Sequence, residues 1–282
     1  MQYKWDINGA IDRWLEEDLG SGDHTTRSTI PYEAAGRARL LVKEEGILAG
    51  AEVAELVFSR IDPDLRFEPL ITDGSRISRG DVVFRVSGRV HSILIAERLI
   101  LNLMQRMSGI ATQTGIFVNM VEGTGTRILD TRKTTPGMRM LEKEAVLLGG
   151  GTNHRIGLYD MILIKDNHID FAGGIENAIL RAGEYIRERG LDLKIEVETR
   201  SLEDVRKVLE TGGVHRIMFD NFTPEQTRTA VQLVGGRYET ESSGGIRLDT
   251  IRSFAECGVD FISVGALTHQ IRSLDLSLKA DF

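Results

Sequence analysis

The feature that most constrains the fold is a regular alternation in the second half of the chain. Short apolar or β-branched runs recur there, and each is followed by a stretch with the spacing of a helix. The runs occupy residues 127–129, 161–164, 194–197, 216–219, 238–241 and 261–264. Strands that alternate with helices favour parallel βα units, because a parallel strand pair needs a long crossover connection. We therefore expect one parallel sheet built from these runs.

Two of the intervening helices have clear ends in the sequence. Ser201, followed by acidic residues, is typical of an N-cap, and the Gly212-Gly213 pair predicts the end of that helix. Thr223 before Pro224 predicts the start of the next helix. Because no dinucleotide-type glycine fingerprint follows the first run, a closed or nearly closed βα barrel is favoured over an open doubly wound sheet.

Residues 1–110 follow a different pattern, which predicts a smaller α/β domain without a site of its own. Its expected helices and strands lie at 6–17, 36–42, 51–61 and 82–88. A long apolar helix over 91–107 closes this domain, and we place the boundary in or just after it, near Ser108 and Gly109. Residues 111–270 are then expected to form the barrel domain.

The charge balance and the cysteine count exclude several classes of protein. Lys and Arg number 35 against 42 Asp and Glu, for a net charge of -7, which argues against non-specific binding to nucleic acid. The single cysteine, Cys257, excludes an internal disulfide and a cysteine-based metal cage. No uncharged apolar run approaches the ~20 residues that span a bilayer, and residues 1–6 show no apolar signal segment. We expect a cytoplasmic protein that does not bind membranes.

Polar or glycine residues stand where the expected strands end. They are Asp130, Lys165, Glu198, Asp220, Ser243 and Gly265. In a βα barrel the loops at the carboxyl ends of the strands build the active site. These six positions are therefore candidates for the rim of a site.

Cations gather among glycines in the middle of the chain. This group of cations lies within residues 130–137, 149–155 and 165–168. Because Arg and Lys cannot be grouped at low dielectric without an anionic partner, a pocket built from these segments predicts a small, multiply charged anion as ligand.

Two kinds of anion are distinguished by the groups that would bind them. Planar guanidinium groups suit carboxylates, and Arg132, Arg155 and Arg106 are the candidates. Backbone N–H groups in glycine-rich loops suit phosphate, and such loops follow the last two runs at 243–245 and 265–266. Arg106 lies on an otherwise apolar helix face, so a structural salt bridge is an equal interpretation of it.

Two acids, Glu198 and Asp220, lie among these cations. They could hold sugar hydroxyls, hold a divalent metal that bridges phosphates, or stabilise a developing cation. No cluster of His, Cys and Asp has the spacing of a dedicated metal site, so Mg²⁺ carried by a phosphorylated substrate is the expected cofactor. Of the 6 histidines, His154 beside Arg155 is the candidate for the site.

Seven segments in register resemble the quinolinate phosphoribosyltransferase family and extend over nearly the whole chain. They are 17–20, 103–112, 131–137, 149–155, 163–168, 219–221 and 243–246. The resemblance implies a small N-terminal α/β sandwich and an incomplete βα barrel, with the tail 271–282 packed on the N-terminal domain. It also implies a reaction of NAD biosynthesis: quinolinate and phosphoribosyl pyrophosphate (PRPP) react, with Mg²⁺, to give nicotinate mononucleotide, pyrophosphate and CO₂. A homodimer or higher even oligomer with shared active sites is implied as well.

The resemblance also assigns residues to the substrates. Glu198 and Asp220 would hold the ribose hydroxyls and favour the cationic ribosyl centre. Lys133 or Lys165 would restrain the departing carboxylate and relay a proton, and Arg106 would reach the site from a partner subunit. The expected quinolinate-side residues are Arg106, Thr131, Arg132, Lys133, His154, Arg155 and Lys165, and the expected 5′-phosphate residues are Ser243, Gly244, Gly245, Val264, Gly265 and Ala266.

Some alternatives stay open. A sister phosphoribosyltransferase could use nicotinate, whose single carboxylate would be over-supplied by three arginines, or it could be the similar protein associated with molybdenum transport. A non-catalytic barrel that binds an anion would have no use for Glu198 and Asp220, which lower anion affinity. Glu196 could also face the site in place of Glu198; we expect Glu198, because it lies nearer the rim.

Overall fold

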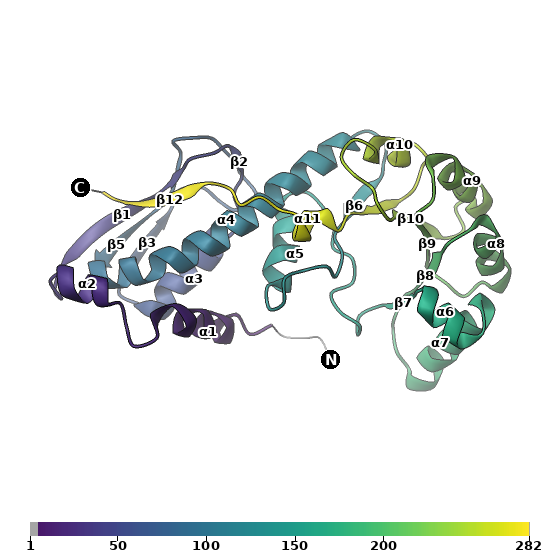
Figure 1. The fold of residues 1–282 in the computed structure, drawn as a ribbon, viewed down its shortest axis with the longest axis horizontal. Coiled ribbons are helices and arrows are strands. Elements are labelled where there is room, and N and C mark those ends of the chain that lie inside the picture. Colours follow the sequence, from purple (N-terminus) through teal and green to yellow (C-terminus); the bar gives the residue numbers. More distant parts are fainter. Residues whose placement is uncertain (1–4, 282) are drawn as a thin grey trace. The chain divides into compact units, whose positions relative to one another are not determined.

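The computed structural model describes residues 5–281, and its ribbon is drawn in Figure 1. The chain divides into two compact units. The first, called here the N-terminal unit, runs up to Gly115 and includes Thr135–Gly150 and the residues from Gln270 on. The second, the barrel unit, comprises Ile116–Thr134 and Gly151–His269.

The barrel unit contains a parallel sheet of six strands in the order β6-β11-β10-β9-β8-β7. The strands are β6 (Arg127–Leu129), β7 (Ile162–Ile164), β8 (Ile195–Thr199), β9 (Arg216–Asp220), β10 (Glu239–Ser243) and β11 (Phe261–Ser263). All six expected strands are thus confirmed. The first two along the chain, β6 and β7, lie at opposite edges of the sheet, and among residues 5–281 a single bridge from Leu129 to Thr152 extends the sheet beyond β6. The incomplete βα barrel is therefore confirmed.

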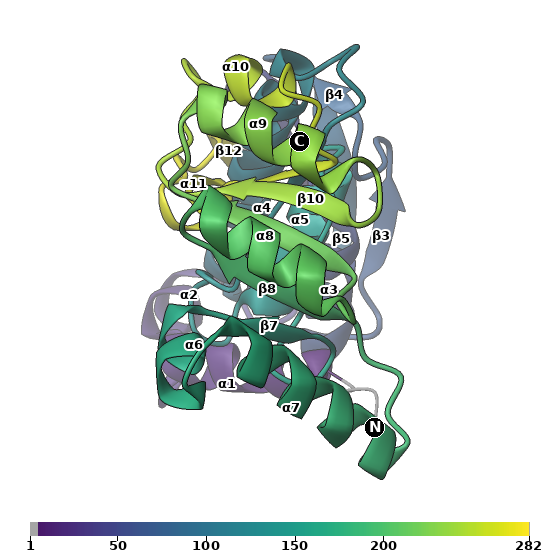
Figure 2. The same ribbon diagram turned by 90° about the vertical axis from the view of Figure 1, so that its right-hand side faces the viewer.

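Helices cover the outer face of this sheet, and Figure 2 shows α8 in front of the strands and α9 next to it. The two predicted helix starts are confirmed, because the Ser201 side chain accepts the N–H of Asp204 and Thr223 accepts the N–H of Gln226. The helices are α6 (Asp166–Ala172), α7 (Ile175–Arg189), α8 (Leu202–Thr211), α9 (Pro224–Val234), α10 (Ile251–Ala255) and α11 (Ala266–His269).

The N-terminal unit is built on an antiparallel sheet in the order β12-β1-β5-β3. Phe58 of α3 packs on Phe67 and Phe84, with ring centroids 6.0 and 5.9 Å away. Its strands are β1 (Ala35–Val42), β3 (Arg66–Pro69), β5 (Val82–Arg89) and β12 (Leu276–Ala280), beside a second sheet of β2 (Gly46–Ile47) and β4 (Arg76–Ile77). Its shorter helices are α1 (Ile7–Leu19), α2 (His24–Thr29), α3 (Ala51–Ile61) and α5 (Arg139–Leu148).

The longest helix, α4 (Val90–Met120), corrects the expectation of a helix that ends at residue 107. The Ser108-Gly109 pair marks close packing there. The Ser108 hydroxyl donates to Ala49 O, and a Cβ on Gly109 would lie 2.3 Å from Arg272 O. A glycine in a helix therefore allowed the C-terminal segment to approach the backbone. Neither α4 nor any other helix within residues 5–281 is long and apolar enough to cross a membrane.

Candidate active site at the rim of the parallel sheet

The predicted rim residues all lie at one end of the barrel unit. Because the six strands are parallel, their carboxyl ends share one edge of the sheet. Across the sheet the rim runs from the cationic segment after β6, past the glycine-containing loops after β11 and β10, to the acids of β9 and β8 and the lysine after β7. In that order its residues are Asp130, Gly265, Ser243, Asp220, Glu198 and Lys165.

The segment after β6 presents two exposed cations. Lys133 N–H donates to Thr131 Oγ1 at 3.1 Å, and Lys133 O accepts the Thr268 hydroxyl at 2.8 Å. These bonds fix the backbone of the segment to α11. Within residues 5–281, neither Arg132 nor Lys133 forms an ion pair with an acidic side chain. Both cations are therefore available to an anionic ligand.

Arg155 is a third cation of the barrel unit and is half-buried. Its Nη1 donates to Met161 O at 3.1 Å, which holds the side chain in place. Burial and the neighbouring charge of Arg132 lower the pKa of Arg155. Since repulsion between two guanidinium groups costs free energy, an anion bound between them would offset that cost.

The acids of the rim lie together at the ends of β8 and β9. Glu198 is 7% exposed, and its Oε2 accepts a hydrogen bond from Lys165 Nζ at 3.0 Å. Burial, followed by the charge of Glu198, raises the pKa of Asp220. The structure thus groups Glu198, Asp220 and Lys165, as the sequence predicted for a shared rim.

A strained junction joins the ends of β9 and β10. Asn221 has a φ of 57°, in the left-handed region, and its N–H donates to Ser243 O at 2.8 Å. Gly244 has a φ of 92°, and a Cβ there would lie 2.3 Å from Asn221 Oδ1. Only glycine fits this position without a shift of Asn221. The sequence placed Asn221 in the 219–221 motif but predicted no role for it.

The loop after β11 offers mainly backbone to the rim. Val264 is 2% exposed, so its side chain belongs to the core, and its N–H donates to Leu129 O at 2.9 Å. Gly265 and Ala266 are partly exposed. Any phosphate bound here would contact main-chain groups, as the sequence predicted for this loop.

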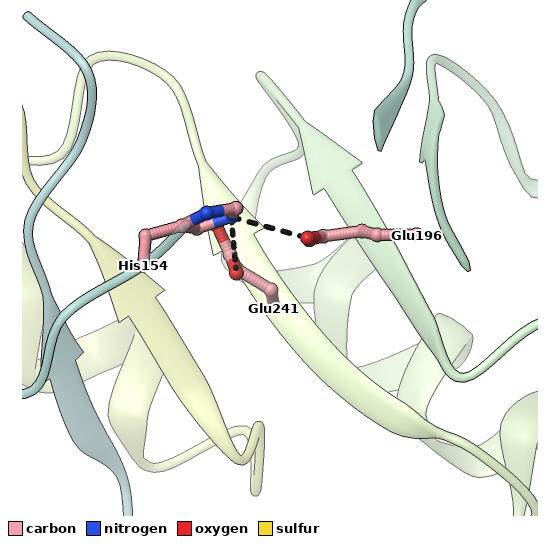
Figure 3. Close-up of side chains that lie close together, drawn as sticks. All are labelled: His154, Glu196 and Glu241. Carbon is pink, nitrogen blue, oxygen red and sulfur yellow. Dashed lines mark ion pairs between the residues drawn. The ribbon is translucent and has the colours of Figure 1, made fainter. Parts of the chain in front are cut away.

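His154 is buried and lies close to Glu196 and Glu241, as Figure 3 shows. Its backbone N–H donates to Asp130 Oδ1 at 2.8 Å, and its Nδ1 accepts the N–H of Arg155 at 2.7 Å. The other ring nitrogen, Nε2, lies 3.1 Å from Glu196 Oε2 and 3.6 Å from Glu241 Oε2. Nδ1 is therefore hydrogen-bonded, Nε2 faces two acids at ion-pair distance, and His154 supports the site from below.

Glu196 and Glu198 point to the same face of β8, because strand side chains alternate with a period of two. Glu198 lies at the rim, whereas Glu196 lies deeper in the barrel and contacts His154. Which of the two glutamates reaches the rim therefore depends on their depth in the barrel and not on the face of the strand. Glu241 of β10 was not predicted, because the burial of the middle residues of this polar strand, ETESS, is visible only in the structure.

Arg106 belongs to the N-terminal unit and has an acidic partner there. Its Nε and Nη2 donate to Glu142 Oε1 at 2.9 and 2.6 Å, and Nη2 also donates to Thr135 Oγ1 at 2.8 Å. Glu142 is fully buried. A local ion pair therefore accounts for this cation within one chain, whereas the resemblance implied that it reaches the site of a partner subunit. A role in the partner's site stays a prediction.

Comparisons with known proteins match nearly the whole chain. Residues 23–108 and 110–279 match the N-terminal and C-terminal domains of quinolinate phosphoribosyl transferase. A chloroplastic nicotinate-nucleotide pyrophosphorylase (carboxylating) of Arabidopsis thaliana is 45% identical over 98% of this chain and 83% of that protein. A probable nicotinate-nucleotide pyrophosphorylase (carboxylating) of Bacillus subtilis is 42% identical over 96% of this chain and 92% of that protein. The solved nicotinate-nucleotide pyrophosphorylase of Francisella tularensis is 38% identical, with a TM-score of 0.92 over 98% of this chain and 96% of that one.

Proposed function

Because the chain belongs to the quinolinate phosphoribosyltransferase family, we propose that its rim site transfers the phosphoribosyl group of PRPP to quinolinate. Pyrophosphate and CO₂ leave, and nicotinate mononucleotide is formed for NAD biosynthesis. The observation that carries the proposal is the division of the rim. After β6 lie Arg132 and Lys133, which have no acidic partner within residues 5–281, and two carboxylates lie at the ends of β8 and β9.

The chemistry needs both halves of this rim. As the bond from C1′ to pyrophosphate breaks, positive charge develops on the sugar, and Glu198 and Asp220 stabilise it. The pyridine nitrogen then bonds to C1′ and becomes cationic. The bond to the adjacent carboxylate breaks, CO₂ leaves, and the electron pair stays on the ring carbon, which takes up a proton.

The cations bind the two carboxylates of quinolinate in this proposal. Arg132 and Arg155 suit carboxylates because a guanidinium group donates two parallel hydrogen bonds. Lys133 restrains the carboxylate that leaves, and Thr131 shapes the loop around it. The backbone of 243–245 and 265–266 binds the 5′-phosphate, whereas the Val264 N–H, also expected there, is already donated to Leu129 O.

Mg²⁺ enters with PRPP in our proposal and has no separate protein site. Asp220 is partly exposed beside Glu198, and carboxylate oxygens of this kind suit a hard cation that keeps several waters. We expect chelation of Mg²⁺ to abolish turnover and excess Mg²⁺ to restore it. We also expect the dialysed protein to retain no stoichiometric metal by elemental analysis.

The direct test is incubation of the protein with quinolinate, PRPP and Mg²⁺. We expect CO₂, pyrophosphate and nicotinate mononucleotide in equal amounts, and little product when nicotinate replaces quinolinate. Faster turnover of nicotinate would instead identify a sister phosphoribosyltransferase. Binding of the substrates without any product would identify a non-catalytic barrel.

We further propose a homodimer, or a higher even oligomer, with shared active sites. The barrel unit exposes apolar side chains on and before α6 and α7, among them Phe171 at 91% and Leu158 at 72%. Large apolar side chains this exposed favour an interface between subunits. As compartment we propose the cytoplasm, and the single, unpaired Cys257 fits a reducing environment.

A mixing experiment tests the shared site. Arg106→Ala and Lys133→Ala are each expected to be nearly inactive, whereas a refolded mixture of the two should recover up to about a quarter of wild-type activity. Recovery follows because half of the dimers then hold one intact site. Glu142→Gln is the control, since it weakens the local ion pair but keeps Arg106. Failure of the mixture, together with equal damage from Glu142→Gln, would leave Arg106 a purely structural role.

A further inference from the structure

Beneath the rim lies a group of ionisable side chains to which the proposed reaction gives no role. Glu196 of β8, Glu241 of β10 and His154, which are drawn in Figure 3, meet Arg216 of β9 inside the barrel. We call these four side chains the buried quartet. Both glutamates have no exposed surface, and His154 is 9% exposed. Arg216 Nη1 donates to Glu241 Oε2 at 3.0 Å and lies 4.0 Å from Glu196 Oε2.

The hydrogen bond from Arg155 fixes the protonation of His154. A backbone N–H can only donate, so His154 Nδ1 must accept and carries no proton. The neutral ring then bears its proton on Nε2, which faces the two carboxyl groups. An imidazolium would direct a second N–H at the N–H of Arg155, so this geometry holds the ring neutral.

With His154 neutral, the quartet contains one cation and two carboxyl groups. One proton on the carboxyl pair makes the quartet neutral. A net charge costs more free energy in a buried site than in an exposed one. Glu196 Oε1 and Glu241 Oε1 are buried and accept no hydrogen bond from residues 5–281. Burial raises the pKa of Glu196 to about 7 and, with the nearby charge of Glu196, that of Glu241 to about 8.

Arg155 connects the quartet to the rim in two ways. Its backbone N–H is bonded to His154, and its guanidinium group is attracted by the charge of Glu196. Any change in the charge or position of the quartet therefore acts on a cation of the proposed quinolinate site.

We propose that Glu196 and Glu241 hold one proton between them and act, through neutral His154, as positioning residues for Arg155, so that the charge of this pair sets the affinity for quinolinate. The inference rests on the proposed function for its substrate.

Within residues 5–281, no other charged group around the carboxyl pair supplies the positive charge that this proton provides. Glu239 of β10 accepts Arg216 Nε and Nη2 at 3.2 and 3.1 Å, and Arg127 of β6 stacks on Phe261. Ser263 on β11 is uncharged. The ligand atoms of His154, Glu196 and Glu241 lie within 4.8 Å of one another, as in a metal site, but Arg216 already supplies the compensating cation there. We therefore assign a proton, and not a metal ion, to the pair of Glu196 and Glu241.

The pH dependence of quinolinate binding tests the proposal. When the pH rises through the pKa of the pair, a second negative charge appears next to Arg155 and weakens anion binding. At saturating PRPP, KM for quinolinate should therefore rise by about tenfold from pH 6 to pH 9, while kcat changes less. Glu196→Gln and Glu241→Gln should keep KM near its value at pH 6 across this range. Glu239→Gln, which removes a more exposed partner of Arg216, should retain the wild-type profile.

Two readouts do not depend on activity. A carboxyl whose pKa is raised on folding stabilises the protein below its unfolded pKa, and this contribution is lost as the pH rises through the folded pKa. The melting temperature of the wild type should thus fall between pH 6 and pH 9 by more than that of Glu196→Gln. Nitrogen-15 NMR of labelled histidine should show His154 protonated at Nε2 only.

The outcomes separate this proposal from the proposed function. No turnover of quinolinate by the wild type would refute the proposed function, and the melting and NMR data would still decide where the proton is. A wild-type pH profile in both Glu→Gln variants, or an imidazolium at His154 at pH 7, would overturn the proposal. Loss of stability at all pH values with an unchanged profile would reduce the quartet to a structural element.

Discussion

Replacing Lys133 with Ala is expected to lower kcat by ~10²-fold or more, by analogy with the loss of one preorganised electrostatic group. The exposed ammonium group lies on the segment after β6 and, among residues 5–281, forms no ion pair with an acidic side chain. In the proposed reaction it restrains the carboxylate that leaves as CO₂. Steady-state release of CO₂, measured with both substrates saturating, gives kcat directly.

Two further variants make the Lys133 experiment specific. Lys207→Ala is the matched control, because Lys207 is an exposed lysine of α8 that pairs with the exposed Glu203. Lys133→Arg keeps the positive charge but cannot give up a proton at neutral pH. Recovery with Arg would indicate electrostatic restraint, and continued loss would indicate a proton relay. Near-normal activity of Lys133→Ala would refute the assignment.

Replacing the rim acids is expected to have an effect of similar size. Glu198→Gln and Asp220→Asn should each lower kcat by ~10²-fold to ~10³-fold, because each removes a negative charge that stabilises the cationic sugar. KM for quinolinate should not rise, since loss of an acid does not weaken an anion site. The measurement is kcat and KM for both substrates, obtained by product formation at pH 7.5.

The electrostatic coupling of the two acids offers an independent check. Because Glu198 is among the causes that raise the pKa of Asp220, Glu198→Gln should lower the pKa of Asp220, which carboxyl-carbon NMR can follow. Glu203→Gln is the control, because that side chain is 66% exposed on the neighbouring helix α8. An unchanged kcat in both rim variants would exclude the proposed stabilisation of the sugar cation.

Much of the fold could be predicted from local patterns. The runs that became β6 to β11 were apolar or β-branched and regularly spaced, and capping residues such as Ser201 and Thr223 have a local physical effect. The end of α4 could not be predicted in this way. Gly109 in a helix normally suggests a break, and only contact with the distant Arg272 explains why it is there.

Part of the candidate site could be predicted because parallel strands place their carboxyl ends together. Glu198, Asp220 and Lys165 were expected to share a rim, and the structure groups them. The partners of Arg106 and His154 were not predictable, since Glu142 and Glu241 are far from them in sequence and their burial depends on packing.

The sequence by itself determined the alternation of strands and helices, the polar rim and the family of the chain, because these depend on local periodicity and on motifs in order. Only the tertiary structure decided which charges neutralise one another. Arg106 has Glu142, Glu198 has Lys165, and the buried quartet forms around Glu196. Ion pairing depends on distance and burial, and neither follows from the order of residues along the chain.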